Sequence, residues 1–138
     1  MKKQAAALLI LMLAGLTGLV NAQTSRVIKA QVPFDFVAGD RVLTAGETSI
    51  KIESDGQTVL WITRGNEHMA ALPNASESMP PSEITYLGFR EYQGHYFLSS
   101  IHRQGESRGY QLPMSTLERE LRAQNVTEKD VTLVASLQ

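Results

Sequence analysis

The sequence of 138 residues contains no cysteine. Disulfide bridges, thiolate metal sites and a lipid anchor on cysteine are therefore excluded. Positive charge is also scarce, because 13 lysines and arginines are outnumbered by 14 aspartates and glutamates, for a formal net charge of −1. Binding to nucleic acid calls for a basic stripe, so we do not expect nucleic acid among the partners.

The sequence also lacks an apolar run of the length that is typical of a membrane span. A largely apolar run extends from Ala5 to Val20, whereas a helix that crosses a bilayer needs roughly 20 apolar residues. Two lysines precede this run and small residues ending at Ala22 follow it, which is the pattern of a secretory signal peptide. We predict a signal peptide at 1–22 and a single β-rich domain at 23–138, in the periplasm or outside the cell. No stable membrane span is expected after cleavage; an uncleaved N-terminal anchor is the alternative.

The rest of the chain consists mainly of short segments in which apolar residues alternate, as they do in β-strands. Pro33 predicts a kink in the first segment, and Ser54-Asp55-Gly56 predicts a hairpin. The consecutive apolar residues from Val59 to Ile62 predict a strand buried on both faces, and residues 73–82 and 104–109 have the composition of loops. Strands are expected at 26–37, 42–43, 48–53, 58–63, 68–72, 84–92, 95–102 and 131–135.

The stretch from Ile84 to His102 is predicted to be a long central hairpin that turns at Gln93-Gly94. A two-residue turn of this kind needs positive φ at both positions, which glycine supplies without strain. Side chains alternate between the two faces of a strand. One face is then expected to carry Ile84, Tyr86, Arg90, Tyr92, His95, Phe97 and Ile101, and the other Leu87, Phe89, Glu91, Tyr96, Leu98 and His102.

One helix is predicted, from Ser115 to Gln124. Ser115 and Glu118 have the spacing of a capping box, Leu117 and Leu121 are expected to dock on the sheet, and Glu118 is expected to pair with Arg122 on the outside. The sequence therefore predicts an all-β fold, an antiparallel β-sandwich or small barrel of six to eight strands with one short helix in the C-terminal half.

Four motifs together resemble those of a family of small secreted β-rich proteins of acidobacterial type. They are VPFDF at 32–36, GDRVLTAG at 39–46, FREY at 89–92 with YFL at 96–98, and LPMSTLEREL at 112–121. The sequence departs from the family pattern at Thr44, where a proline is expected. The family is uncharacterised, so the resemblance implies a secreted β-rich domain and transfers no catalytic residue.

No constellation of residues predicts catalysis. By strand parity His95 and His102 point to opposite faces, and His68 borders a predicted loop, so no metal site is expected. A Gly-x-Ser-x-Gly motif is absent, and no recognisable spacing ties together the candidate carboxylates Asp35, Asp40, Glu91 and Glu106. We predict no catalytic residue and no cofactor, and a hydrolase is the least favoured alternative.

The favoured hypothesis is an exported non-catalytic domain that acts by binding a partner through its surface. The alternative is a small-ligand protein that holds an apolar molecule or a sugar in an aromatic-lined cleft. The candidate binding residues are Trp61, Tyr86, Tyr92, His95 and Phe97, although the same rings are also suited to the core. An exposed edge strand that accepts a strand from a partner is a further route to binding.

Overall fold

A computed structural model of the chain describes residues 26–78 and 80–138, so the predicted signal peptide lies outside the described residues. In this part, no helix has the length and apolar character needed to cross a membrane. Its elements are β1 (Val27–Val32), β2 (Phe36–Ala38), β3 (Arg41–Leu43), β4 (Gly46–Asp55), β5 (Gln57–Arg64), β6 (Glu67–Ala71), β7 (Ala75–Ser78), β8 (Thr85–Tyr92), β9 (His95–His102), β10 (Arg108–Gln111), α2 (Thr116–Ala123) and β11 (Glu128–Leu137).

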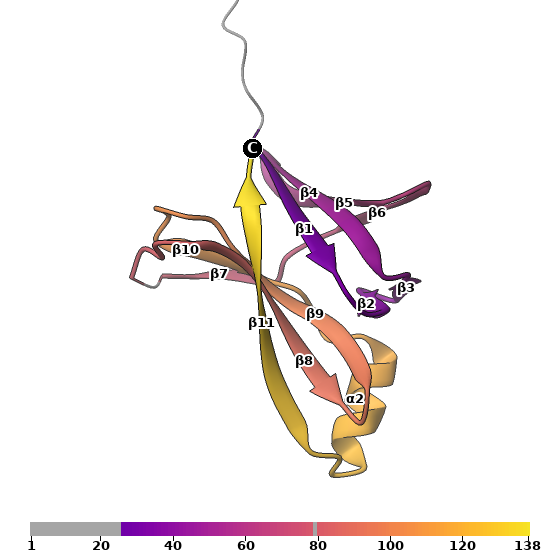
Figure 1. Cartoon of the computed structure of the whole chain (residues 1–138). Helices are drawn as coiled ribbons and strands as arrows, with labels where there is room; N and C mark the ends of the chain where they lie inside the picture. The colour runs from indigo at the N-terminus through magenta and orange to yellow at the C-terminus, as the bar shows by residue number, and fades with distance from the viewer. Residues whose placement is uncertain (1–25, 79) are drawn as a thin grey trace, which may run out of the picture.

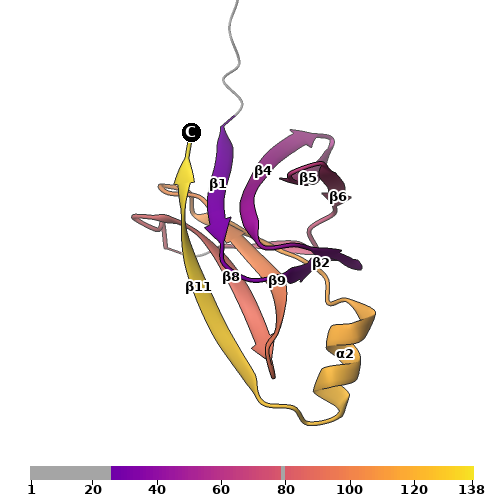
Figure 2. The same ribbon diagram turned by 45° about the vertical axis from the view of Figure 1, so that its right-hand side comes forward.

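The strands join into one strongly curved sheet in the order β3-β2-β9-β8-β11-β1-β4-β5-β6, and β10 with β7 branches from β9. The pairing is antiparallel except between β2 and β9. The sheet curls into a nearly closed barrel, with β4, β5 and β6 turned over the side where β2 and β3 lie (Figures 1 and 2). The predicted all-β class, with a barrel and one short helix, is confirmed.

The predicted number of strands, six to eight, is wrong, because the described part contains eleven. The first predicted strand is divided into β1 and β2 around Pro33, whose ring lacks the N–H that a continuous ladder needs. β7 lies in a segment predicted to be a loop, and β10 overlaps another. These two pair with each other from Ser78 opposite Arg108 to Ala75 opposite Gln111, so a pairing between distant segments overrides their local composition.

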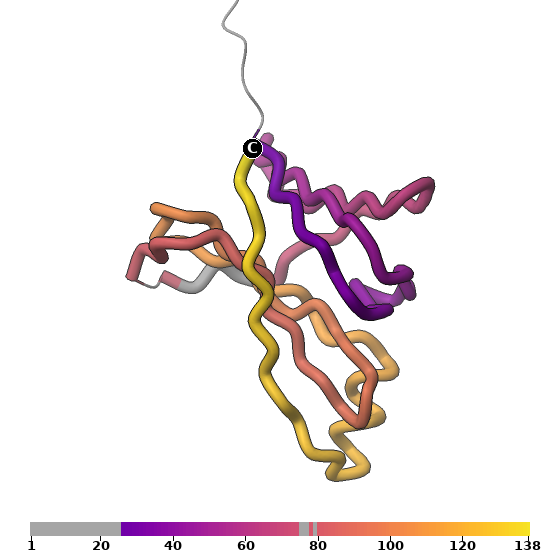
Figure 3. The backbone as a smooth tube through the Cα atoms, viewed as in Figure 1, coloured from indigo at the N-terminus to yellow at the C-terminus, as the bar shows by residue number. Residues whose placement is uncertain are grey.

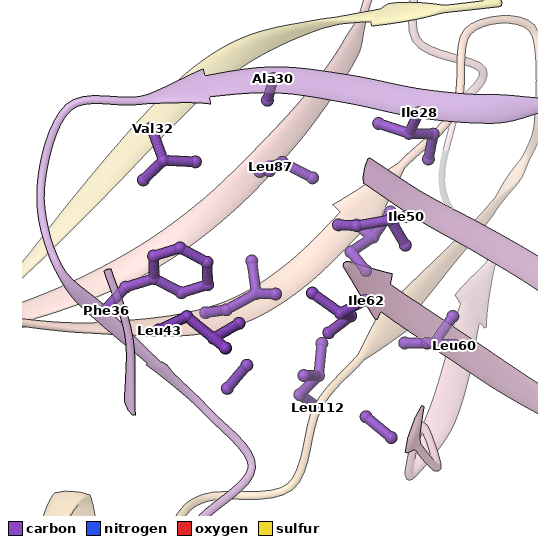
Figure 4. Close-up of a cluster of buried hydrophobic side chains, with 14 of the residues drawn as sticks. Ile28, Ala30, Val32, Phe36, Leu43, Ile50, Leu60, Ile62, Leu87 and Leu112 are labelled. Carbon is purple, nitrogen blue, oxygen red and sulfur yellow. The ribbon is translucent and has the colours of Figure 1, made fainter. Parts of the chain in front are cut away.

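The core fills the inside of the curved sheet. Its side chains come from alternate positions of β1, β4, β5 and β8, with further contributions from β2, β3 and the segment after β10 (Figure 4). Phe36 meets Phe89 edge to face at a centroid distance of 5.5 Å. The prediction that Val59–Ile62 is buried on both faces is wrong: Leu60 and Ile62 are buried, whereas Trp61 between them is exposed.

The central hairpin of β8 and β9 forms with the predicted turn and register. Gln93 and Gly94 have φ of 48° and 84°, and Tyr92 faces His95 while Phe89 faces Leu98. Beyond Phe89 a bulge inserts one extra residue in β9, so that Gly88 faces Ser100.

The bulge shifts the alternation of side chains in the second half of β9. The predicted faces of Ile101 and His102 are therefore wrong. Ile101 faces Leu87 on the inside, and His102 faces Tyr86 on the outside, where the two rings stack at a centroid distance of 4.3 Å. His95 and His102 consequently share a face but lie at opposite ends of β9.

The beginning of β1 and the end of β11 lie side by side (Figure 3). Val27 and Gln138 exchange two backbone hydrogen bonds of 2.9 Å, and Ile28 faces Leu137. On its other side β11 pairs with β8 along almost its whole length. β11 is thus the strand that connects the two halves of the sheet.

Candidate functional site

The helix α2 covers the outer face of the hairpin through a glutamate. Ser115 caps the helix by accepting a hydrogen bond of 3.1 Å from the Glu118 backbone N–H. The predicted outward pairing of Glu118 is wrong, since Glu118 is only 1% exposed. The predicted docking of Leu117 on the sheet is wrong as well, since Leu117 is exposed. The helix is therefore turned so that the Glu118 carboxylate, and not Leu117, points inward, while Leu121 is half-buried.

The carboxylate of Glu118 is held by three donors from β8. Arg90 donates from Nε and, at 3.2 Å, from Nη2, and the Tyr92 hydroxyl donates at 3.1 Å. Phe97 packs edge to face against Tyr92 with centroids 5.7 Å apart. Because a buried charge is tolerated only when it is paired and hydrogen-bonded, this set accounts for the burial of Glu118 structurally. We call Arg90, Tyr92, Phe97 and Glu118 the outer cluster.

Tyr92 should make the fold sensitive to alkaline pH. Burial and the Glu118 carboxylate raise the pKa of Tyr92 from 10.0 to about 12. The pKa of Tyr92 is higher in the folded state than in the unfolded state, so the neutral hydroxyl stabilises the fold. This stabilisation is complete below about pH 10. It is lost as the pH rises toward 12, where the free energy of unfolding should have fallen by up to about 3 kcal/mol.

Urea titrations of the wild type and of Tyr92→Phe between about pH 9 and about pH 12 measure this loss, because the variant lacks the titrating hydroxyl. The wild type should lose more stability over this interval than the variant. Equal losses would contradict the assignment.

The five predicted binding residues do not form one surface. Tyr92 and Phe97 are buried in the outer cluster. This agrees with the alternative interpretation that these rings are core side chains. Tyr86 is half-buried against His102, and His95 is exposed beside the hairpin turn. Trp61 lies on β5, in the other half of the sheet.

Trp61 is held in place on the outer face of β4 and β5. Its Nε1 donates a hydrogen bond of 2.9 Å to Glu53, and Lys51 Nζ lies 2.7 Å from the other oxygen of that carboxylate. The hydrogen bonds from Lys51 and Trp61 lower the pKa of Glu53 from its usual value. The indole ring is thereby fixed at the surface with much of its face open.

One side of Trp61 borders a cleft of about 520 Å³. The opposite wall is the turn between β2 and β3, and the floor is β6 with the residue that follows it. Arg41 reaches across and donates a hydrogen bond of 2.8 Å to the His68 carbonyl. We call this the β6 cleft; its lining residues are Gly39, Asp40, Arg41, Trp61, His68, Met69, Ala70, Ala71, Leu72 and Pro113.

A second cleft, of about 360 Å³, lies on the helix side of the same turn. Asp40 lines both clefts and accepts a hydrogen bond of 3.4 Å from the Thr116 backbone N–H. We call this the helix cleft; it is lined by Val37, Asp40, Val42, Ser115, Thr116 and Leu117. The turn thus forms a ridge between two adjoining hollows.

Exposed apolar side chains gather at these two clefts. Large hydrophobic residues that are exposed in the described part number six, and four of them line the clefts: Val42 (66%), Leu72 (50%), Trp61 (44%) and Leu117 (43%). Exposed apolar side chains that gather in one place mark a binding surface more often than single ones do. The clefts are therefore the candidate functional site.

The titratable side chains of the site are few. In residues 26–78 and 80–138, no group of three or more His, Asp or Glu side chains is placed to hold a metal ion. Of the three histidines only His68 lines the β6 cleft, and Asp40 is the one candidate carboxylate that lines it as well. Comparison of the chain with protein-family models, with curated proteins and with solved structures finds no match. The resemblance to secreted acidobacterial proteins thus stays a prediction.

Sequence reasoning identified only Trp61 among the residues of the site. Val42, Leu72 and Leu117 belong to segments far apart in the chain, and the curvature of the sheet brings them together. One local signal was present: Leu72 is followed by Pro73, which has no N–H to continue the ladder, so the apolar side chain of Leu72 lies just beyond the end of β6. Nothing in the local pattern indicates that Leu117 faces outward.

Proposed function

We propose that this protein is an exported, non-catalytic β-domain that binds a protein partner through the β6 cleft and the helix cleft. The observation that carries the proposal is the gathering of Trp61, Leu72, Val42 and Leu117 around one ridge. The predicted signal peptide supports export to the periplasm or the outside of the cell.

The exposure of the lining favours a protein over a small molecule. Small-ligand sites enclose most of the ligand surface, whereas the large apolar side chains here remain about half exposed and lie on both sides of a ridge. A protein surface can cover both hollows at once, and apolar side chains in a polar rim are typical of the centre of such interfaces. The one aromatic ring at the site, Trp61, belongs to a residue type enriched among interface hot spots.

Photo-crosslinking tests this proposal at the helix cleft. A photoreactive amino acid replaces Val42 in the full chain, which is then produced with its own signal in the bacterium that naturally makes it. We expect a discrete adduct with another protein of the envelope or the medium. The adduct should disappear when Leu117→Lys is added, because the charge would be desolvated in the interface.

The matched control places the same photoreactive residue at Val134, which is equally exposed but lies outside both clefts. This position should give no such adduct. The proposal would be overturned by the absence of an adduct at position 42, or by the same adducts at positions 42 and 134.

A further inference from the structure

Arginine side chains connect the two ends of the curved sheet at the β6 cleft. The strands β3 and β6 stand at the ends of the strand order, and Arg41 of β3 donates a hydrogen bond of 2.8 Å from Nη1 to the His68 carbonyl of β6. Arg64 of β5 donates from Nε to the carbonyls of Thr44 and Ala45, at 3.0 Å and 2.9 Å. The position of the Arg41 guanidinium is therefore fixed across the cleft by a backbone group.

The bond to His68 leaves most of the Arg41 guanidinium available to a ligand. A guanidinium carries five N–H groups on three nitrogens, and within residues 26–78 and 80–138 the bond from Nη1 is the one interaction that Arg41 makes. Nε and Nη2 form the fork that matches a carboxylate, and in this part of the chain they have no partner. Because Arg41 is exposed, a group from another molecule can reach this fork.

The outer cluster shows what the same fork binds elsewhere in this protein. Arg90 donates from Nε and Nη2 to the two carboxylate oxygens of Glu118. Arg41 presents the same two nitrogens but, among the described residues, has no ion pair with a carboxylate. An anion with two oxygens in one plane is thus the group that would complete it.

The other residues of the β6 cleft define the surroundings of that anion. Asp40 is the acidic residue among those that line the cleft, and its carboxylate accepts from the Thr116 N–H on the helix side of the turn. Trp61 and Leu72 line the same cleft and expose apolar surface. Arginine beside tryptophan is the combination most enriched at interface hot spots. The ligand that fits carries a negative charge next to an apolar group.

We propose that the protein partner places an acidic side chain, glutamate or aspartate, on the fork of Arg41 and an apolar side chain next to it against Trp61 and Leu72. The inference deepens the proposed function, on which it rests, by naming the chemistry of the partner at the β6 cleft. A chain terminus is usually captured by successive backbone N–H groups, whereas the donor here is a guanidinium. The occupant is therefore a side-chain carboxylate.

Two blocked pentapeptides, Ala-Leu-Glu-Leu-Ala and Ala-Leu-Gln-Leu-Ala, test the preference for a carboxylate. Trp61 is the single tryptophan of the sequence, so its indole N–H signal in the NMR spectrum of the full chain measures binding at the β6 cleft. The glutamate peptide should bind about fivefold more tightly than the glutamine peptide, the upper range for an exposed ion pair. The peptide Ala-Ala-Leu-Leu with a free C-terminal carboxylate should bind no better than the glutamine peptide.

Variants of Arg41 show whether its fork is the recognising group. Arg41→Gln should bind the two blocked peptides equally. Arg41→Lys keeps a positive charge and a donor for His68 but lacks the planar fork, so it should lose most of the preference; this variant decides the matter if Arg41→Gln does not fold. Arg119→Gln is the matched control, because Arg119 is exposed on α2 outside both clefts, and it should keep the full preference.

The proposal would be overturned by an unchanged indole signal with both blocked peptides, or by a preference below about twofold in the wild type. A preference that persists in Arg41→Gln or Arg41→Lys, or tighter binding of the peptide with the free terminus, would overturn it as well. The adduct at Val42 requires only that a protein covers the clefts. It would therefore still form if the carboxylate preference were absent, and the proposed function would stand.

Discussion

Replacing Glu118 with alanine should lower the free energy of unfolding by about 3–5 kcal/mol, the range found when one partner of a buried ion pair is removed. The substitution leaves the Arg90 guanidinium without its carboxylate and the Tyr92 hydroxyl without its acceptor. Arg90 retains partial access to solvent, at 19% of its side chain, so we expect the lower end of this range. The backbone N–H that Ser115 caps is unaffected.

Urea denaturation of the wild type and of Glu118→Ala measures the loss, and Glu120→Ala is the matched control because Glu120 is exposed on the same helix. The control should change stability by less than about 0.5 kcal/mol, as substitutions at ordinary surface positions do. A double variant with Arg90→Met and Glu118→Leu should recover much of the loss, since apolar residues often replace a buried ion pair without cost. A loss below about 1 kcal/mol for Glu118→Ala would show that the outer cluster does not support the fold.

Phe97→Ala should cost about 3–5 kcal/mol, as truncation of a buried phenylalanine does. Phe97 is 2% exposed and lies against Tyr92, outside the main core cluster. The stability of this variant therefore shows whether side chains on the outer face of the hairpin form a small core of their own. Removing the ring leaves a cavity beside Tyr92 and weakens the support of its hydroxyl group.

Thermal and urea unfolding of Phe97→Ala measure this cost, with Val134→Ala as the control on an exposed strand position. The control should remain within about 0.5 kcal/mol of the wild type. If Phe97→Ala behaves like the control, the outer cluster is not a packed core. Additivity with Glu118→Ala is not expected, because both residues contact Tyr92.

The central hairpin and the helix were predictable because local signals determine them. Gly94 tolerates the positive φ of the turn, and this fixes the facing pairs up to Phe89. Ser115 provides the cap of the helix, and Asn125, with φ of 55°, marks its end. Each of these features depends on residues within a few positions of one another.

The features that the sequence did not reveal depend on distant segments. Glu118 turns inward because Arg90 and Tyr92 on β8 donate hydrogen bonds to its carboxylate. The i,i+4 spacing to Arg122, seen alone, favours an outward pair.

The extra residue of the bulge in β9 is Ser99, between Leu98 opposite Phe89 and Ser100 opposite Gly88. Its effect is large, since one extra residue exchanges the faces of Ile101 and His102.

The candidate site was the least predictable part for the same reason. Prediction gathered Trp61 with residues of the hairpin, whereas the exposed apolar surface is built from Trp61 on β5, the β2–β3 turn, β6 with Leu72, and the start of α2. Trp61 alone is common to both. Side chains alternate along β5, so Trp61 lies outside, between the inward-facing Leu60 and Ile62. The consecutive apolar residues from Val59 to Ile62 gave no sign of this alternation in the sequence.

The position of β11 has a consequence for how the chain folds. The strand β11 lies between β8 and β1, which are far apart in the sequence. The β8 and β1 parts of the sheet are therefore joined only when β11 pairs with both, and these contacts connect positions widely separated in sequence. Such a topology folds slowly compared with one built from local contacts.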